Sequence, residues 1–234
     1  MPRAVAVNVG ANTNAPGVRG PIFPDGTFEF VPIPETEPTD GDVPTYADLD
    51  LRTDLPAEVL DSPVHLDPEF AEYPCCERYT YGDPHGVKAR PLLDLAAGDY
   101  ALFYATLAPR GDGHPDWVVP DWGAYLVGAF ELARDPVSGE EYPDLPADER
   151  AAFANNAHVH RETFDAAVLL AGTERSSLFD RPVPLSSDAG TEANRLVTDR
   201  SADSGKGPWW RRPLRFDADA VTALRESVPE LPGC

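Results

Sequence analysis

Two short histidine-containing segments carry residue types that bind metals or move protons. His65 and Asp67 lie two positions apart, and His158 and His160 form a second pair with the same spacing. If the second pair lies on a strand, both histidines point to one face and could share a metal ion or a substrate, with His65 or Asp67 completing the set. Nothing in the sequence shows that the two segments meet in space. Ordinary polar contacts in loops or helix caps explain these residue types equally well. We therefore predict no metal and no cofactor.

The loop after the first apolar segment is rich in asparagine and glycine. Its candidate ligand-binding residues are Asn12, Asn14, Arg19 and Asp25, with Asn8 just before them. Side-chain amides and backbone N–H groups in such a loop can face a base or a phosphate. Turn formation explains the same residues, because asparagine and glycine tolerate positive φ angles. The glycine patterns of phosphate-binding and dinucleotide-binding loops are absent, so no nucleotide cofactor is predicted.

A third group combines aromatic rings with cations near a turn. Arg78, Tyr79 and Tyr81 follow one another closely, and Arg90 lies downstream. These residues could stack on a base and neutralise a phosphate. The alternative is that the tyrosines are half-buried on an edge strand.

The fourth group is an aromatic and cationic run near the end of the chain, Trp209, Trp210, Arg211 and Arg212. Two adjacent tryptophans on a strand cannot both point into one core, so one of them would be exposed beside an arginine and suited to stacking. The alternative is a hydrophobic clamp that holds a C-terminal helix. Arg161, next to the second histidine pair, completes the candidate ligand-binding residues.

Catalytic residues cannot be assigned from the sequence. Cys75 and Cys76 lie in no recognisable nucleophile signature, and Ser176 and Ser177 lack the glycine pattern of a nucleophile elbow. Carboxylates are so frequent that no catalytic pair stands out. Whether the chain is an enzyme is left open.

The composition indicates an acidic globular protein. Forty aspartates and glutamates against nineteen lysines and arginines give a formal net charge of -21. Molar salt screens the resulting self-repulsion, since the Debye length falls to about 3 Å at 1 M, so we expect a protein adapted to a very salty cytoplasm. A hydrophobic fraction of 42% is enough to build a core, which argues against an acidic disordered chain. No apolar stretch is long enough to span a membrane, and the three cysteines Cys75, Cys76 and Cys234 imply no disulfide framework.

The pattern of apolar residues and turns predicts a single domain over residues 1–234, with an α+β fold. We expect a mixed, largely antiparallel sheet or small β-barrel, with short peripheral helices and long loops. The predicted strands are residues 4–9, 22–23, 28–31, 100–107, 124–132, 166–171 and 182–185, and residues 35–45 and 186–207 are predicted as loops. The predicted helices are residues 90–95, 146–156 and 218–227, the last ended by Pro229 and Pro232.

Several strings along the chain resemble the nucleotide modification associated domain 3 family. The resemblance rests on Gly20-Pro-Ile-Phe-Pro-Asp-Gly26, Phe28, Pro32-Ile-Pro34, Thr45-Tyr-Ala-Asp-Leu49, His65-Leu-Asp-Pro68, the Gly98-Asp99 turn with its aromatic strand, and the late Trp-Arg segment. These strings cover most of the chain in the expected order. The resemblance implies involvement with modified nucleotides, without a particular reaction.

The middle of the chain is also similar to PUA-like domains of the EVE and ASCH kind. This similarity lies in Arg90-Pro-Leu-Leu-Asp-Leu-Ala-Ala-Gly-Asp99, the following Tyr-Ala-Leu-Phe-Tyr104, and Tyr125-Leu-Val-Gly128. It implies a small β-barrel that binds RNA or a flipped, modified base in a pocket with aromatic walls. Its core would span roughly residues 76–185, with an N-terminal hairpin segment at 3–34 and a C-terminal helix at 217–228 packed on it.

These observations favour a cytoplasmic module that binds a base or nucleotide by aromatic stacking and arginine contacts. In molar salt, counterion release offers little driving force, so affinity would come from stacking and from hydrogen bonds to base edges. The first alternative is an enzyme that uses His65, Asp67, His158 and His160 as acid/base groups or metal ligands. The second is a protein-interaction subunit of a modification or defence system.

Overall fold

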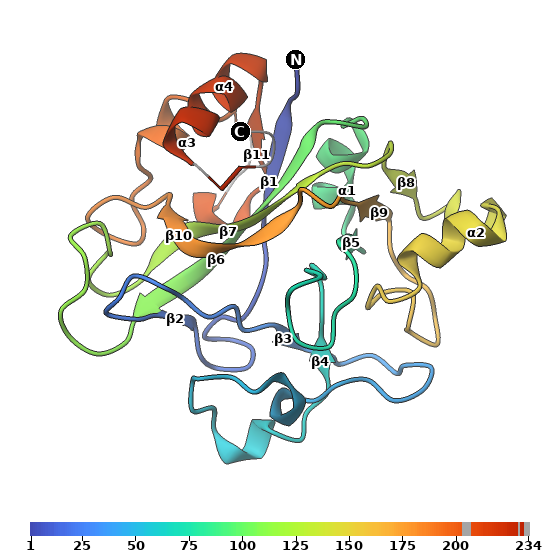
Figure 1. The fold of residues 1–234 in the computed structure, drawn as a ribbon, viewed down its shortest axis with the longest axis horizontal. Helices are drawn as coiled ribbons and strands as arrows, with labels where there is room; N and C mark the ends of the chain where they lie inside the picture. The colour runs from blue at the N-terminus through green and yellow to red at the C-terminus, as the bar shows by residue number, and fades with distance from the viewer. Residues whose placement is uncertain (203–206, 229, 232–234) are drawn as a thin grey trace.

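The computed structural model describes residues 1–202, 207–228 and 230–231, and a large central sheet dominates it (Figure 1). Six strands form this sheet in the order β10-β7-β6-β1-β11, with β2 paired to one end of β6. Their bounds are β1 (Ala4–Asn8), β2 (Gly20–Ile22), β6 (Tyr100–Pro109), β7 (Gly123–Glu131), β10 (Ser177–Pro184) and β11 (Leu214–Phe216). β1 and β2 run parallel to β6, and the other neighbours are antiparallel. The sheet is therefore mixed and largely antiparallel.

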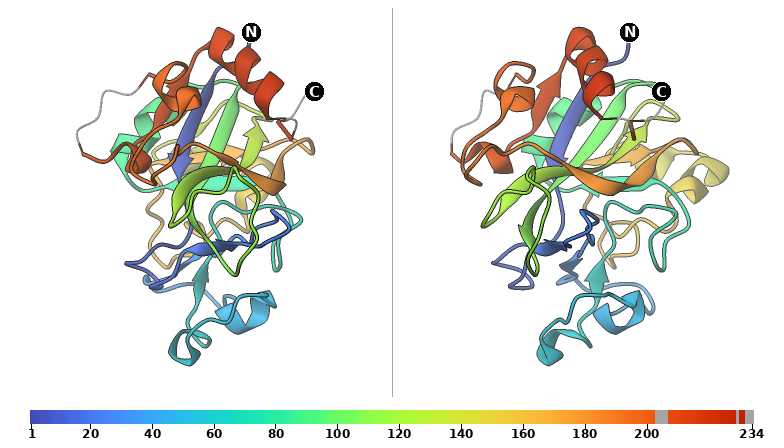
Figure 2. Two further views of the ribbon diagram at one scale, coloured as in Figure 1. Left: turned by 90° about the vertical axis from the view of Figure 1, so that its left-hand side faces the viewer. Right: turned by 60° about the vertical axis from the view of Figure 1, so that its left-hand side comes forward.

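The strands β6 and β7 are apolar at nearly every position because the sheet is buried on both faces. Alternate side chains of a strand point to opposite faces, so Phe103 joins one hydrophobic cluster and Leu102 the other. Leu224 of the helix α4 (Ala218–Ser227) packs in the cluster of Leu102. That helix and α3 (Arg195–Thr198) lie over one face of the sheet, as the two views of Figure 2 show. Smaller sheets and loops cover the other face.

Two small sheets flank the central one. β3 (Ile33–Pro34) pairs with β4 (Val64–His65), and β5 (Thr80–Asp83) pairs with β9 (Val168–Ala171), which also pairs with β8 (Val137–Ser138). The remaining helices are short: α1 (Gly86–Leu93), α2 (Ala147–Arg150) and the 3-10 helices Tyr46–Leu49, Ala57–Val59, Tyr142–Asp144, Ala151–Phe153 and Trp209–Arg211. The loops that connect these small sheets and short helices lie close to the C-terminal end of β1.

The predicted α+β class, the largely antiparallel sheet and the short helices are confirmed. The predicted strands at 100–107 and 124–132 correspond to β6 and β7, and the predicted final helix to α4. Pro229 and Pro232, expected to end that helix, and Cys234 lie outside the described residues. None of the helices in the described ranges is long and apolar enough to cross a membrane.

Four expectations are corrected. The strand predicted at 28–31 is absent, and Phe28 forms only an isolated bridge with Ile22. The central sheet does not close into a barrel, because β10 and β11 stand at its two ends and no pairing in the described chain joins them. The helix predicted at 90–95 begins earlier, at Gly86, so that Pro91 lies inside it. The loop predicted at 186–207 contains the short helix α3, in which the Asn194 side chain accepts a hydrogen bond from the backbone N–H of Leu196.

Candidate metal centre

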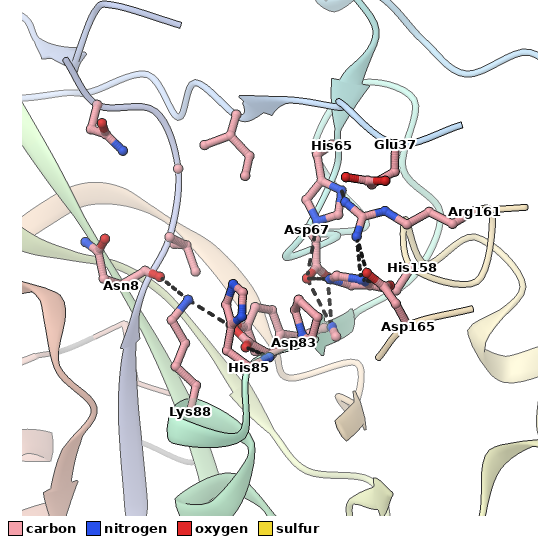
Figure 3. A pocket seen from close by; sticks show the side chains of 17 residues that line it. Asn8, Glu37, His65, Asp67, Asp83, His85, Lys88, His158, Arg161 and Asp165 are labelled. Atoms are coloured by element: carbon pink, nitrogen blue, oxygen red, sulfur yellow. Dashed lines mark hydrogen bonds and ion pairs between the residues drawn. The ribbon is translucent and has the colours of Figure 1, made fainter. Parts of the chain in front are cut away.

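A pocket of about 440 Å³ opens where the central sheet meets the two small sheets (Figure 3). Its walls come from the end of β1 and the following loop, from β3 and β4, from β5 and the start of α1, and from the turn that follows the 3-10 helix Ala151–Phe153. The lining residues are Asn8, Val9, Gly10, Asn12, Ile33, Glu37, His65, Asp67, Tyr81, Gly82, Asp83, Pro84, His85, Lys88, His158, Arg161 and Asp165.

Three buried side chains meet in this pocket and present one potential metal ligand each. The Oδ2 atom of Asp67 lies 3.9 Å from Nε2 of His65 and 3.6 Å from Nε2 of His158. The three candidate ligand atoms all lie within 4.8 Å of one another. These separations are too long for direct hydrogen bonds and leave a space between the three atoms.

Each histidine ring also bonds a second carboxylate, through the ring nitrogen that does not face Asp67. Nδ1 of His65 lies 2.6 Å from Oε2 of Glu35, and Nδ1 of His158 lies 2.7 Å from Oδ1 of Asp165. Carboxylates bonded to an arginine only accept hydrogen bonds, so each Nδ1 carries the proton that it donates. In a neutral ring with this tautomer, Nε2 presents a lone pair, and the Nε2 atoms of both rings face Asp67.

Arg161 links the two carboxylates that hold the histidines. Its Nη2 lies 2.9 Å from Oε1 of Glu35, and its Nη1 lies 2.6 Å from Oδ2 of Asp165. The guanidinium is a planar fork whose donors suit two carboxylates at once. One side chain therefore fixes both outer partners of the histidine pair.

Gly82 and Asn156 both donate hydrogen bonds to the side chain of Asp67. The Gly82 N–H donates to Asp67 at 3.0 Å, and the side-chain amide of the fully buried Asn156 donates to Oδ1 of Asp67, also at 3.0 Å. The carbonyl of the same amide accepts from the backbone N–H of His158. A Cβ at Gly82 would lie 2.7 Å from the ring of His158 and 2.9 Å from Asn156. Only glycine leaves room for this approach.

Burial and neighbouring charges set the protonation of the cluster. Burial raises the pKa of Asp67 well above its ordinary value, against the hydrogen bond from Gly82. Burial, with the nearby His65, lowers the pKa of His158 to about 4, so this ring is neutral at pH 7. Burial favours protonation of Glu35 too, but hydrogen bonds from His65 and Arg161 outweigh it and lower the pKa of Glu35 to about 2.

The arrangement has the chemistry of a mononuclear metal site. Two imidazoles and one carboxylate form a ligand set of the catalytic zinc and non-haem iron type, with ligand distances of about 2.0–2.2 Å. Histidine ligands usually donate their second N–H to a carboxylate, as Glu35 and Asp165 accept it here. A cation between the three atoms would also relieve the cost of a buried carboxylate facing two lone pairs.

A second polar group lines the pocket opposite the histidines. The Tyr81 hydroxyl donates to Oδ2 of Asp83 at 2.8 Å, and Nζ of Lys88 lies 3.0 Å from the same oxygen. Lys88 also donates to the backbone carbonyl of Asn8 at 3.1 Å. His85 stands at the start of α1 beside this group and is exposed (Figure 3). The pocket thus has one wall of candidate metal ligands and one of carboxylate, lysine and histidine.

Four of the predicted ligand-binding residues line this pocket: Asn12, Tyr81, His158 and Arg161. His65 and Asp67, named as possible partners of the second histidine pair, join them there. Tyr81 is buried with its hydroxyl on Asp83, so its ring is not free for stacking. Asn12 forms a local turn in which its side chain accepts from the Asn14 N–H.

His160 does not share the site with His158, contrary to the expectation for two residues on one strand. Residues 154–160 form turns rather than a strand, so alternate side chains do not point to one face. The backbone N–H groups of Val159 and His160 both donate to the carbonyl of Asn156, which curls the chain. His65, rather than His160, lies beside His158 in the pocket.

The other predicted residues lie elsewhere. Asn14 and Asp25 belong to turns, and Arg78, Arg90 and Arg211 are exposed on other parts of the molecule. Tyr79 packs edge-on against Phe130.

Arg19, Trp209 and Trp210 form a separate cluster with Trp122. The Arg19 guanidinium lies 4.6 Å from the centre of the Trp122 ring, and Trp122 meets Trp210 edge-on. Nε1 of Trp209 donates to the Thr191 carbonyl at 2.9 Å. Both late tryptophans are partly buried in a 3-10 helix and pack against the cluster beneath α4. The clamp alternative describes this placement better than an exposed stacking ring.

The sequence interpretation missed the residues that contact the candidate ligands, which are Glu35, Asn156, Asp165 and Gly82. It also missed Asp83 and Lys88 on the opposite wall. Glu35 was assigned to an exposed loop but is buried. Its one local signal is that it follows the apolar run ending at Pro34. Asp165, four residues after Arg161, follows the spacing of a local ion pair. Asn156 and Gly82 carry no signal without the fold.

The nucleotide modification associated domain 3 family matches residues 3–226, nearly the whole chain, and the chain belongs to this family. Its description gives the protein a general role connected with nucleic-acid modification. No curated protein and no solved structure matches the chain.

Proposed function

We propose that this protein is a metal-dependent enzyme of nucleotide modification, with His65, Asp67 and His158 as the metal ligands. The observation that carries the proposal is the convergence of two Nε2 atoms on one carboxylate oxygen, with both Nδ1 atoms bonded to carboxylates. A structural role would be served by direct hydrogen bonds, whereas these three atoms stand 3.6 Å or more apart.

Three protein ligands leave coordination positions for water and substrate. A divalent ion held in this way activates a water molecule or polarises a substrate oxygen. Around it, Glu35 and Asp165 orient the rings, Arg161 holds these two carboxylates, and Asn156 and Gly82 orient Asp67. Glu37 and His85 line the pocket and are exposed, so they are available to exchange protons with a bound substrate.

Metal binding is the first test. The purified protein, stripped and titrated separately with Zn²⁺, Mn²⁺ and anaerobic Fe²⁺, should bind one ion per chain. His65→Ala, Asp67→Ala and His158→Ala should each weaken binding by about 100-fold or more, since loss of outer partners alone costs about 10- to 100-fold. His160→Ala and His85→Ala are matched controls that keep the affinity of the parent. Substoichiometric binding of all three metals, or an equal loss in His160→Ala, would exclude the assignment.

Catalysis is tested separately. Metal-loaded protein is incubated with nucleotides and with DNA, and the products are analysed by mass spectrometry. A product that forms only with metal and is lost in His158→Ala supports the enzyme. A product that His158→Ala still forms at the parent rate would contradict it.

Base recognition by stacking is the second candidate, and the tryptophan cluster with Arg19 has the aromatic and cationic side chains that it would use. Its rings lie partly buried against one another, and Arg19 already occupies one face of Trp122. Stacking contributes about 1–3 kcal/mol per base, so Trp210→Ala should weaken binding of single-stranded nucleic acid about tenfold or more if this cluster is the reading surface. Unchanged binding would remove the candidate. A PUA-like architecture, a single domain and protein partners in a modification system also stay predictions.

A further inference from the structure

We propose that the pocket receives the base and sugar of a nucleotide, as uncharged hydrogen-bond donors, and keeps its phosphates outside. This inference rests on the proposed function and names the substrate group that faces the metal ligands. It follows from how the charges of the pocket are already paired.

The cationic side chains that line the pocket are already engaged by carboxylates. Arg161 bonds Glu35 and Asp165, and Lys88 bonds Asp83 together with the Asn8 carbonyl. Recruiting either cation to a phosphate would leave a buried or half-buried carboxylate without its partner. Breaking such a pair is strongly unfavourable when the remaining charge is buried. The pocket therefore differs from a phosphate site, where arginine and lysine side chains await the ligand.

The formal charge of the site is also unsuitable for an anion. Four carboxylates line the pocket, those of Glu37, Asp67, Asp83 and Asp165, and Glu35 stands directly behind His65. Against them stand Lys88 and Arg161, so the site carries three formal negative charges with neutral histidines. A divalent ion at the ligands leaves one. A phosphate dianion placed about 4 Å from a carboxylate is strongly repelled at the effective dielectric of a protein surface.

The same groups suit a donor-rich, neutral ligand. Glu37 presents its carboxylate to the cavity on the side of His65 (Figure 3). On the opposite wall, Oδ1 of Asp83 accepts only the backbone N–H of His85 at 2.8 Å and lies beside the exposed His85. Sugar hydroxyls and exocyclic amino groups of bases are donors that such acceptors bind. A cavity of about 440 Å³ has the size of a small-molecule site. A base in a duplex would reach it only by leaving the stack.

The test compares matched ligands that differ only in phosphate. Affinities of the zinc-loaded protein for the four 2′-deoxynucleosides and their 5′-monophosphates are measured by calorimetry in about 1 M KCl, where the Debye length of about 3 Å screens the overall charge. We expect at least one nucleoside to bind with a Kd below about 1 mM. Its 5′-monophosphate should bind no more tightly, and inorganic phosphate should not displace it. A monophosphate that binds tenfold more tightly, displacement by phosphate, or no nucleoside binding would each overturn the inference.

A charge variant distinguishes the effect of the charge inside the pocket from the effect of the net charge of the protein. Glu37→Gln removes one negative charge from the pocket and should shift the affinity ratio toward the monophosphate by about three- to tenfold. Asp180→Asn makes the same change in net charge on the exposed surface of β10 and should leave the ratio unchanged. Equal ratios in both variants would contradict the inference. Metal titration of the same samples keeps the two proposals apart, since metal binding with a phosphate preference overturns only this one.

Discussion

Gly82 determines how closely the residues of the candidate centre can approach one another. Its N–H donates to Asp67, and its missing side chain leaves the space that His158 and Asn156 occupy. The side chains of Asp67, His158 and Asn156 therefore all approach strand β5 at this one residue. A small change here acts on the geometry of the site without removing any ligand.

Gly82→Ala should therefore lower metal affinity by about 10- to 100-fold, the cost of disturbing outer contacts of a metal site. Overpacking should also destabilise the fold by about 1–3 kcal/mol. Calorimetric metal titration and urea unfolding measure the two effects. The control is Gly86→Ala in α1, where an added Cβ meets nothing within 4 Å and the stability should stay equal or rise slightly. Parent-like metal affinity in Gly82→Ala would show that the approach of His158 to β5 is unimportant.

At the same scale, the sequence indicated the residue types of the site better than their partners. His158 was a candidate from the start, and His65 and Asp67 were named as possible companions. The pairing of His158 with His160 depended on a strand, whereas residues 154–160 form turns in which Val159 and His160 both donate to the carbonyl of Asn156. Asn156 is fully buried, and nothing in its local sequence distinguishes it from Asn155.

At the scale of the structural elements, Arg161 joins two segments that have no regular secondary structure. Glu35 directly follows β3, whereas Arg161 and Asp165 belong to the segment before β9. The isolated bridge between Thr39 and Arg161 reinforces the same junction. The arginine therefore connects the small β3-β4 sheet with the segment that carries His158.

Arg161→Lys keeps the charge but cannot span both carboxylates with a planar fork. We expect metal affinity to fall by about 10- to 100-fold while the chain still folds. Arg161→Met leaves the buried Glu35 with its hydrogen bonds to His65 and the backbone but without its arginine, and should cost about 3–5 kcal/mol of stability. Arg78→Met, on an exposed arginine, is the control for the loss of one positive charge. If Arg161→Lys binds metal as the parent does, the double contact has no role in holding the ligands.

Elements with strong local patterns were predictable, and those created by packing were not. β6, β7 and α4 carry continuous apolar runs or a capping aspartate, Asp217, and were placed within a residue or two. β3 and β4 pair over two residues each and are distant in sequence, so no local pattern marks them. The start of α1 was misplaced because Pro91 resembled a first-turn proline, whereas it lies inside the helix.

For the whole molecule, metal binding should appear as stability. Two of the proposed ligands precede the central strands β6 and β7 in the sequence and the third follows them, so an ion would bind only the folded chain with all three in place. At a free metal concentration of about 100 times the Kd, the stabilisation is about 2.7 kcal/mol. For a chain of this size each kcal/mol raises the Tm by about 2–4 °C, so differential scanning calorimetry should show a rise of about 5–10 °C. His158→Ala should show none, and a parent-like rise in that variant would place the ion elsewhere.

The net charge of -21 leads to a second prediction at this scale. Raising KCl from about 0.1 M to about 1 M shortens the Debye length from about 10 Å to about 3 Å and reduces repulsion in the compact state. The urea midpoint of unfolding should therefore rise with KCl, whereas a neutral osmolyte of equal osmolality should not reproduce the whole effect. A flat or falling midpoint would contradict the expected adaptation to salt.

The order of the ligands along the chain also has a consequence for biosynthesis. His65 and Asp67 precede the central strands β6 and β7, and His158 follows them. A ribosome therefore exposes two ligands well before it has made the third, together with Asp165 and the arginine between them. The nascent chain passes through most of its synthesis without a complete chelate. Under the proposed function, ion choice would then be left to the finished molecule, whose fixed geometry would select among metals that a flexible peptide would bind by affinity alone.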